Sequence, residues 1–106
     1  MKSKMDRKKS CGIVAFPERA VREQSMELSR AVAGLVSQNA KKIVFDMGKT
    51  EMIDSATLGV LIHARREHPI NEIDMIILNA TGYVKSLLEN AKFTFLFHME
   101  TSEAKS

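Results

Sequence analysis

Short apolar runs alternate with helix-like patterns along the 106-residue chain. The runs are short enough for strands, and several contain β-branched residues. They lie at 12–16, 43–45, 73–78 and 95–99. Strands that alternate with helices predict an α/β fold, with a mixed, mostly parallel sheet of four to five strands and helices packed against it.

The helix-like segments show apolar stripes at intervals of three and four residues. One stripe lies within 20–38, a second begins near Ser55 and ends before Pro69, and a third lies near the C-terminus. Their apolar members are Leu28, Val32, Leu35 and Val36; Leu58, Leu61 and Ile62; and Val84, Leu87, Leu88 and Ala91. We also expect a short helix to begin within 101–106.

The run Ile43-Val44-Phe45, which ends at Asp46, contains no polar residue. An uninterrupted apolar run is typical of a strand that is covered on both faces. We therefore predict that this strand lies in the middle of the sheet, with both faces buried.

The net charge of +3 is concentrated at the N-terminus. Residues 1–10 hold five basic residues and one acidic residue, a net +4, which leaves −1 for the rest of the chain. We interpret 1–10 as a polar basic leader, with an edge strand as the alternative, and 11–106 as a single domain. A nearly neutral body argues against direct DNA binding, since nucleic-acid-binding domains cluster basic residues on one face.

No segment has the roughly 20 consecutive apolar residues that a membrane span requires. Cys11 is the single cysteine, and no apolar stretch follows the basic N-terminus as in a signal peptide. Together these features predict a cytoplasmic protein.

Asp54 and Ser55 stand at the start of the second helical pattern. Either side chain could cap free backbone N–H groups there, and a simple cap is the common role of such a pair. The functional alternative is a binding site, because small residues follow and because parallel strands end nearby. A phosphate on Ser55 would meet a helix N-terminus, which tolerates negative charge, yet it would place about −1.5 to −2 charges on a docking surface.

Two blocks of sequence make the chain recognisable. One is Ile43-Val44-Phe45-Asp46 followed by Met52-Ile53-Asp54-Ser55-Ala56-Thr57-Leu58-Gly59-Val60-Leu61, and the other runs from Ile76 through Leu96-Phe97. At this spacing the chain resembles the STAS domain family from about Gly12 to Glu100. Within that family it resembles the bacterial anti-sigma factor antagonists.

The resemblance implies a function and its partners. In such antagonists a serine after the aspartate is phosphorylated by a serine kinase with an ATP-binding fold, which is also the anti-sigma factor. The unphosphorylated antagonist binds this partner, and a serine phosphatase reverses the modification. No cofactor is implied.

The resemblance also implies roles for individual residues. Ser55 would be the phosphoacceptor, and Asp54 would orient it and cap the helix. Met52, Asp54, Ala56, Thr57 and Gly59 would border the partner surface. Many members have Ser or Thr at the position of Ala56 and Gly at that of Thr57, so the helix tip departs from the family pattern, and Thr57 becomes a second candidate acceptor.

Enzyme and metal chemistry find little support in the sequence. His63 and His68 are five residues apart, which is not the spacing of a helical metal pair, and Cys11 lacks evident partners. The chain has no Gly-x-Ser-x-Gly motif and no phosphate-binding Gly-x-x-x-x-Gly-Lys loop. We therefore expect a binding protein without catalytic or metal-ligating residues. The alternative function is a non-phosphorylated STAS subunit that regulates a lipid-transport ATPase or serves a stress-signalling scaffold.

Overall fold

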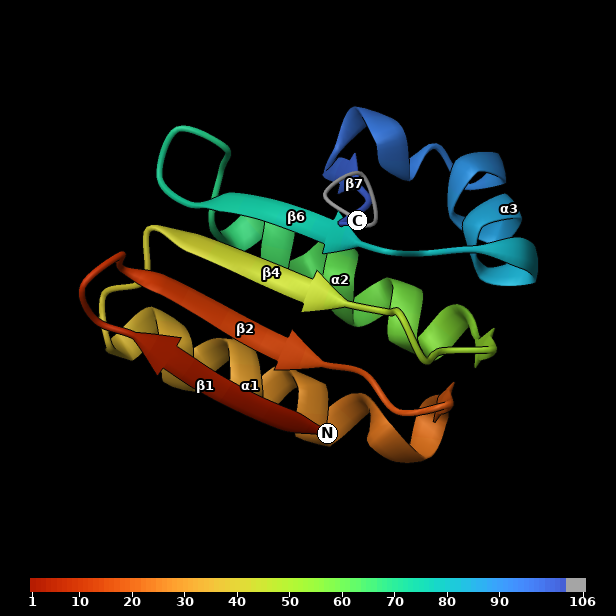
Figure 1. Ribbon diagram of the computed structural model, residues 1–106, viewed down its shortest axis with the longest axis horizontal. Coiled ribbons are helices and arrows are strands. Elements are labelled where there is room, and N and C mark those ends of the chain that lie inside the picture. Colours follow the sequence, from red (N-terminus) through yellow and green to blue (C-terminus); the bar gives the residue numbers. More distant parts are fainter. Residues whose placement is uncertain (103–106) are drawn as a thin grey trace.

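The computed structural model describes residues 1–102, and Figure 1 shows how its elements are arranged. The expected helix start within 101–106 lies largely outside these residues. In chain order the elements are β1 (Lys2–Asp6), β2 (Cys11–Ala15), β3 (Arg19–Ala20), the 3₁₀ turn η1 (Arg22–Gln24), α1 (Ser25–Ser37), β4 (Lys42–Asp46), β5 (Met52–Ile53), α2 (Ser55–Glu67), β6 (Asp74–Leu78), α3 (Gly82–Asn90), the 3₁₀ turn η2 (Phe93–Phe95) and β7 (His98–Glu100).

Within residues 1–102, five strands form the main sheet in the order β1-β2-β4-β6-β7. β1 is antiparallel to β2, and the remaining neighbours are parallel. The predicted mixed, mostly parallel α/β sheet is thus confirmed. Residues 2–6 form the edge strand β1, which places the basic N-terminal segment in the sheet.

The hydrophobic core lies between one face of the sheet and the helices. Figure 1 shows α1 and α2 behind the sheet, where they cover this face. Phe45, at the centre, meets Phe16 and Phe97 edge-on, with ring centroids 6.1 Å away in each case, and Phe93 stacks on Phe97 at 5.3 Å. Alternation along β4 directs Ile43 and Phe45 into this core.

The other face of β4 differs from the prediction. Val44 is partly exposed, so the strand is not buried on both sides. The three α-helices within residues 1–102 leave this face of the sheet without a helical layer (Figure 1). An uninterrupted apolar run cannot distinguish a doubly covered strand from one whose second face is apolar yet open.

Two other element boundaries differ from the prediction. The helix expected over 20–38 begins at Ser25, because Arg19 and Ala20 pair with Met52 and Ile53 as a small second sheet. The last strand begins at His98 instead of 95, because Phe93–Phe95 form the turn that stacks Phe93 on Phe97 in the core.

A buried arginine fastens the C-terminal end of α2. One Arg65 nitrogen donates hydrogen bonds to the carbonyls of His68 and Ile73, and the guanidinium lies 5.9 Å from the Phe97 ring centroid. Burial lowers the pKa of Arg65, while the negative charge of Asp74 acts in the opposite direction. The guanidinium therefore joins the end of α2, the loop to β6 and the aromatic core.

A close contact between α1 and the sheet depends on Gly12. A Cβ added there would lie 2.6 Å from a Leu35 methyl carbon, and Leu35 is buried. We predict that Gly12→Ala lowers the free energy of unfolding by about 1–3 kcal/mol through overpacking. At Gly34, within α1, an added Cβ meets nothing within 4 Å. Gly34→Ala should instead raise it by about 0.5–1 kcal/mol. Urea titrations of both variants test this contrast.

Candidate functional site

Ser55 is the first residue of α2, at the end of the molecule where the parallel strands finish. The chain reaches it from the carboxyl end of β4 through a loop and the short strand β5. Its side chain is exposed, and within residues 1–102 its hydroxyl has no hydrogen-bond partner. This hydroxyl is therefore open to solvent on a fixed helix terminus.

Asp54 is the residue that fixes this terminus. It has extended backbone geometry, as helix-capping residues do. Oδ1 accepts a hydrogen bond from the Thr57 amide at 3.1 Å, and Oδ2 accepts one from the Arg22 amide at 2.9 Å. One carboxylate thus joins the start of α2 to the segment between β3 and α1, which lies 32 residues earlier.

The same two amides favour the charged form of Asp54. The hydrogen bond from Thr57 is the largest influence and lowers the pKa below its ordinary value of 3.8; desolvation opposes it, and the hydrogen bond from Arg22 adds to it. A carboxylate held in this way is ionised throughout the physiological pH range.

A second set of contacts joins the segment that precedes Asp54 to the loop after β2. The amides of Glu51 and Met52 donate to the carbonyl of Glu18, at 2.8 and 3.1 Å. The hydroxyl of Thr50 donates to the carbonyl of Pro17 at 2.9 Å. These contacts extend the β3–β5 pairing, so the loop that carries Asp54 and Ser55 is held by the loop after β2.

Thr57 belongs to this internal framework. Its hydroxyl donates to the Ala20 carbonyl at 2.6 Å, and the residue is 1% exposed. The prediction that Thr57 borders the partner surface, with a hydroxyl available for modification, therefore fails for its side chain. The hydroxyl is turned inward because the backbone of β3 passes directly over the first turn of α2.

The other residues predicted to border the partner surface differ in how exposed they are. Met52 is 38% exposed, Gly59 is exposed, and Asp54 and Ala56 are partly exposed. A Cβ added at Gly59 would meet nothing within 4 Å, so packing does not require glycine there. Ser55 and Gly59 are one helical turn apart and share an exposed stripe of α2.

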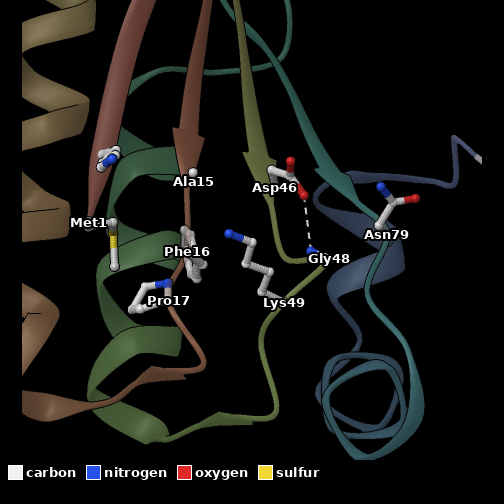
Figure 2. Close-up of a pocket in the computed structure, with 9 residues that line it drawn as sticks. Met1, Ala15, Phe16, Pro17, Asp46, Gly48, Lys49 and Asn79 are labelled. Atoms are coloured by element: carbon white, nitrogen blue, oxygen red, sulfur yellow. Dashed lines mark hydrogen bonds between the residues drawn. The ribbon is translucent and has the colours of Figure 1, made fainter.

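A hollow of about 470 Å³ at the same end of the sheet was not predicted (Figure 2). Residues that follow three parallel strands line it, together with the start of β1: Met1, Lys2, Ala15, Phe16, Pro17, Asp46, Gly48, Lys49 and Asn79. Asp46 accepts a hydrogen bond from the Gly48 amide at 3.0 Å. Polar residues at the ends of the strands were the sequence feature that could have indicated this hollow, because such ends gather at one edge of a parallel sheet.

The histidines and the cysteine are dispersed. His98 Nδ1 lies 3.8 Å from Asp74, His68 Nδ1 lies 3.9 Å from Glu72, and His63 is exposed on α2. Within residues 1–102 no three His, Cys, Asp or Glu side chains are placed to hold a metal ion. Nor does that part of the chain contain a helix of the length and apolarity that crossing a membrane demands.

Fold and site together define a small α/β domain with a mixed, mostly parallel sheet and an exposed serine that begins a helix. The model of the family described as "STAS domain" matches residues 3–106, and the chain belongs to this family. No curated protein sequence matches the chain.

Solved structures resemble the chain closely in fold and distantly in sequence. The anti-sigma factor antagonist SpoIIAA in its unphosphorylated form is 14% identical with a TM-score of 0.76, over 98% of this chain and 90% of that one. The Bacillus SpoIIAA in its phosphorylated form is 13% identical with a TM-score of 0.70, over 92% and 87%.

Two further structures come from other proteins. An anti-sigma factor antagonist from Mycobacterium paratuberculosis is 13% identical with a TM-score of 0.81, over 98% of this chain and 88% of that one. A sulfate transporter family protein from Wolinella succinogenes is 10% identical with a TM-score of 0.65, over 86% and 76%. At these identities the likeness establishes the fold alone.

The hydrogen bonds of Asp54 predict how the stability of the domain depends on pH. Since the folded pKa lies below 3.8, the contribution of Asp54 to stability is complete above that value and is lost as the pH falls through the folded pKa. Asp54→Ala should lower the urea midpoint at pH 7 and flatten its dependence on pH below 4. Glu51→Ala, which removes a neighbouring exposed carboxylate, is the matched control. Equal acid sensitivity of Asp54→Ala and the wild type would contradict this role.

Proposed function

We propose that the chain is a cytoplasmic anti-sigma factor antagonist, a single STAS domain that works by binding and not by catalysis. In its unphosphorylated form it binds an anti-sigma factor that is also a serine kinase with an ATP-binding fold. Phosphorylation of Ser55 ends this binding, and a serine phosphatase restores it. The observation that carries the proposal is the exposed, unbonded hydroxyl of Ser55 on a helix start held by Asp54.

The helix start explains why phosphorylation would spare the fold. Ser55 is the first residue of α2, and the first turn after the capping Asp54 contains no acidic residue. A helix N-terminus offers free amides and a partial positive charge, both of which stabilise an anion. The modified chain therefore keeps the structure of the unmodified one.

The same phosphate is incompatible with a docked partner. Met52, Ala56 and Gly59 leave Ser55 among small or flexible exposed side chains, a surface that another protein can approach closely. About −1.5 to −2 charges at the centre of such an interface would have to be desolvated without a counter-ion. Modification thus switches binding off while the domain stays folded.

The surroundings of Ser55 favour a substrate over an enzyme. A nucleophilic serine needs a base within hydrogen-bond reach. The Ser55 hydroxyl contacts no such group among the described residues, and His63 lies two turns further along α2.

The likeness to a sulfate transporter family protein fits a second candidate function. Here the chain would be a permanent, non-phosphorylated subunit that regulates a transport ATPase or a signalling scaffold, and the α2 tip would be its interface. Binding that tolerates Ser55→Asp would favour this function over the switch.

Substitutions at Ser55 test the switch directly. Ser55→Ala should fold normally, resist phosphorylation and bind the kinase partner whether or not ATP is present. Ser55→Asp should also fold normally and lose measurable binding. Titration calorimetry with the partner measures affinity, and mass spectrometry after incubation with kinase and ATP locates the phosphoryl group. A phosphoryl group elsewhere, with residue 55 unmodified, would refute the proposal.

Gly59 offers a test in which stability and binding move in opposite directions. Gly59→Ala removes a flexible residue from a helix interior without a clash, so the free energy of unfolding should rise by about 0.5–1 kcal/mol. The added methyl group projects from the exposed stripe next to Ser55 and should weaken partner binding by roughly tenfold, or about 1.4 kcal/mol. Gly34→Ala, the matched control on α1, should gain similar stability and keep full affinity. Unchanged affinity in Gly59→Ala would place the interface elsewhere.

A further inference from the structure

The face of the main sheet opposite the helices carries a group of apolar side chains, which we call the open face. Its apolar members are Cys11, Ile13, Ala15, Val44, Ile76 and Leu78. None of them belongs to the hydrophobic core or packs against it. Ile76 is nearly covered by its neighbours on this face, whereas the others are partly or fully exposed. Figure 1 shows α1 and α2 on the far side of the sheet.

Strand register arranges the open face in three rows across the sheet. The middle row is Lys4, Ile13, Val44, Ile76 and His98. The row towards the carboxyl ends of the parallel strands is Lys2, Ala15, Asp46, Leu78 and Glu100; the row towards their amino ends is Asp6, Cys11, Lys42 and Asp74. The middle row is apolar at its centre, and each outer row contains charges.

The two outer rows carry opposite charges on two of the strands and no charge on a third. On β1, Lys2 stands against Asp6; on β4, Asp46 stands against Lys42; on β2, Ala15 and Cys11 are both uncharged. A two-fold axis along the middle row would exchange the outer rows between two copies of the chain. Lys42 of each copy would then face Asp46 of the other, and Ile13, Val44 and Ile76 would meet their own counterparts.

The alternative two-fold axis, parallel to the strands and through β4, is disfavoured by the same residues. It would set Lys42 against Lys42 and Asp46 against Asp46 at the centre of the face. Like charges in contact oppose association. The charge pattern therefore selects one arrangement, with the strands of the two copies running in opposite directions.

The central charges are available for such contacts. Among the described residues neither Lys42 nor Asp46 forms an ion pair. Asp74 would face Leu78 in this arrangement, and Lys4 and His98, at the two ends of the middle row, would each face their own counterparts at the rim of the interface. Asp74 lies 3.8 Å from His98 within its own chain, so its charge has a neighbour.

The area of the open face sets the size of the interface that it can form. β1, β2, β4 and β6 have five residues each, and β7 has three. At about 4.8 Å between strands and about 3.3 Å per residue, the face measures roughly 24 by 17 Å at its widest. Two such faces would bury on the order of 1,000 Å² in total, at the lower end of specific interfaces. From its apolar centre and complementary rows, we propose that the open face is the interface of a weak homodimer, formed by the two-fold axis along the middle row.

This dimer is independent of the proposed switch. α2 lies on the opposite side of the sheet, so both Ser55 tips stay accessible. Because the strands of the two copies run in opposite directions, the tips point towards opposite ends of the dimer.

Sedimentation equilibrium over a range of concentrations tests the proposal. The wild-type chain should change from 11.9 kDa towards twice that mass as its concentration rises from about 10 µM to 1 mM. Lys42→Glu and Asp46→Lys should each weaken association at least tenfold, and the double variant, in which the pair is reversed, should restore it. Lys85→Glu, the same charge change on α3, is the matched control and should leave association unchanged.

Val44→Arg tests the face without touching the hydrogen bond from Gly48 to Asp46, and it should also give a monomer. Circular dichroism confirms that each variant is folded. A wild-type chain that stays monomeric to 1 mM overturns the proposal, as does a dimer that both Lys42→Glu and Val44→Arg leave intact. Folded single variants without rescue in the double variant overturn the two-fold arrangement.

Discussion

The carboxylate of Asp54 is the contact on which the candidate site depends. Its two oxygens accept amide hydrogens from Thr57 and Arg22, residues that belong to opposite sides of the β3–β5 pairing. Without this bridge the amides of Thr57 and Arg22 would lose their protein acceptor, and the start of α2 would lose its link to the segment before α1. The exposed Ser55 therefore has a fixed backbone position, because the carboxylate of the neighbouring Asp54 is held from both sides.

The main sheet separates two kinds of surface. One face supplies Ile43, Phe45 and their neighbours to the core, while the other presents Val44 between charged rows. This division places the helix tip and the open face on different parts of the molecule. The proposed partner interface and the proposed dimer interface therefore lie on different parts of one domain and do not exclude each other.

Sequence periodicity predicted the main strands and helices because each has enough residues to display a pattern. It could not predict β3 and β5, since strands of two residues show no periodicity and form only through each other. The boundary of β7 was wrong for a related reason: Phe95-Leu96-Phe97 is apolar throughout and continues into His98-Met99, and the stacking of Phe93 on Phe97 places Phe95 in a turn. The open side of β4 was missed because its apolar run is the same for a covered face and an uncovered one.

Residue type and position in the sequence predicted part of the candidate site. Asp54 as a cap and Ser55 at the helix start were both evident from residue type and position. The partner of the second Asp54 oxygen and the inward turn of Thr57 were not, because both depend on backbone that passes over α2 from more than 30 residues away. Local sequence cannot reveal contacts of this range.

The burial of Thr57 has one more consequence. Two hydroxyl groups stand two residues apart at the same helix start, and the fold leaves only that of Ser55 accessible, so discrimination between them requires nothing from a modifying enzyme. Access to the Thr57 hydroxyl requires β3 to detach from the first turn of α2 and the hydrogen bond to Ala20 to break. Any chemical label found on Thr57 would therefore record an opening event, and this residue serves as an internal reporter of local unfolding next to the site.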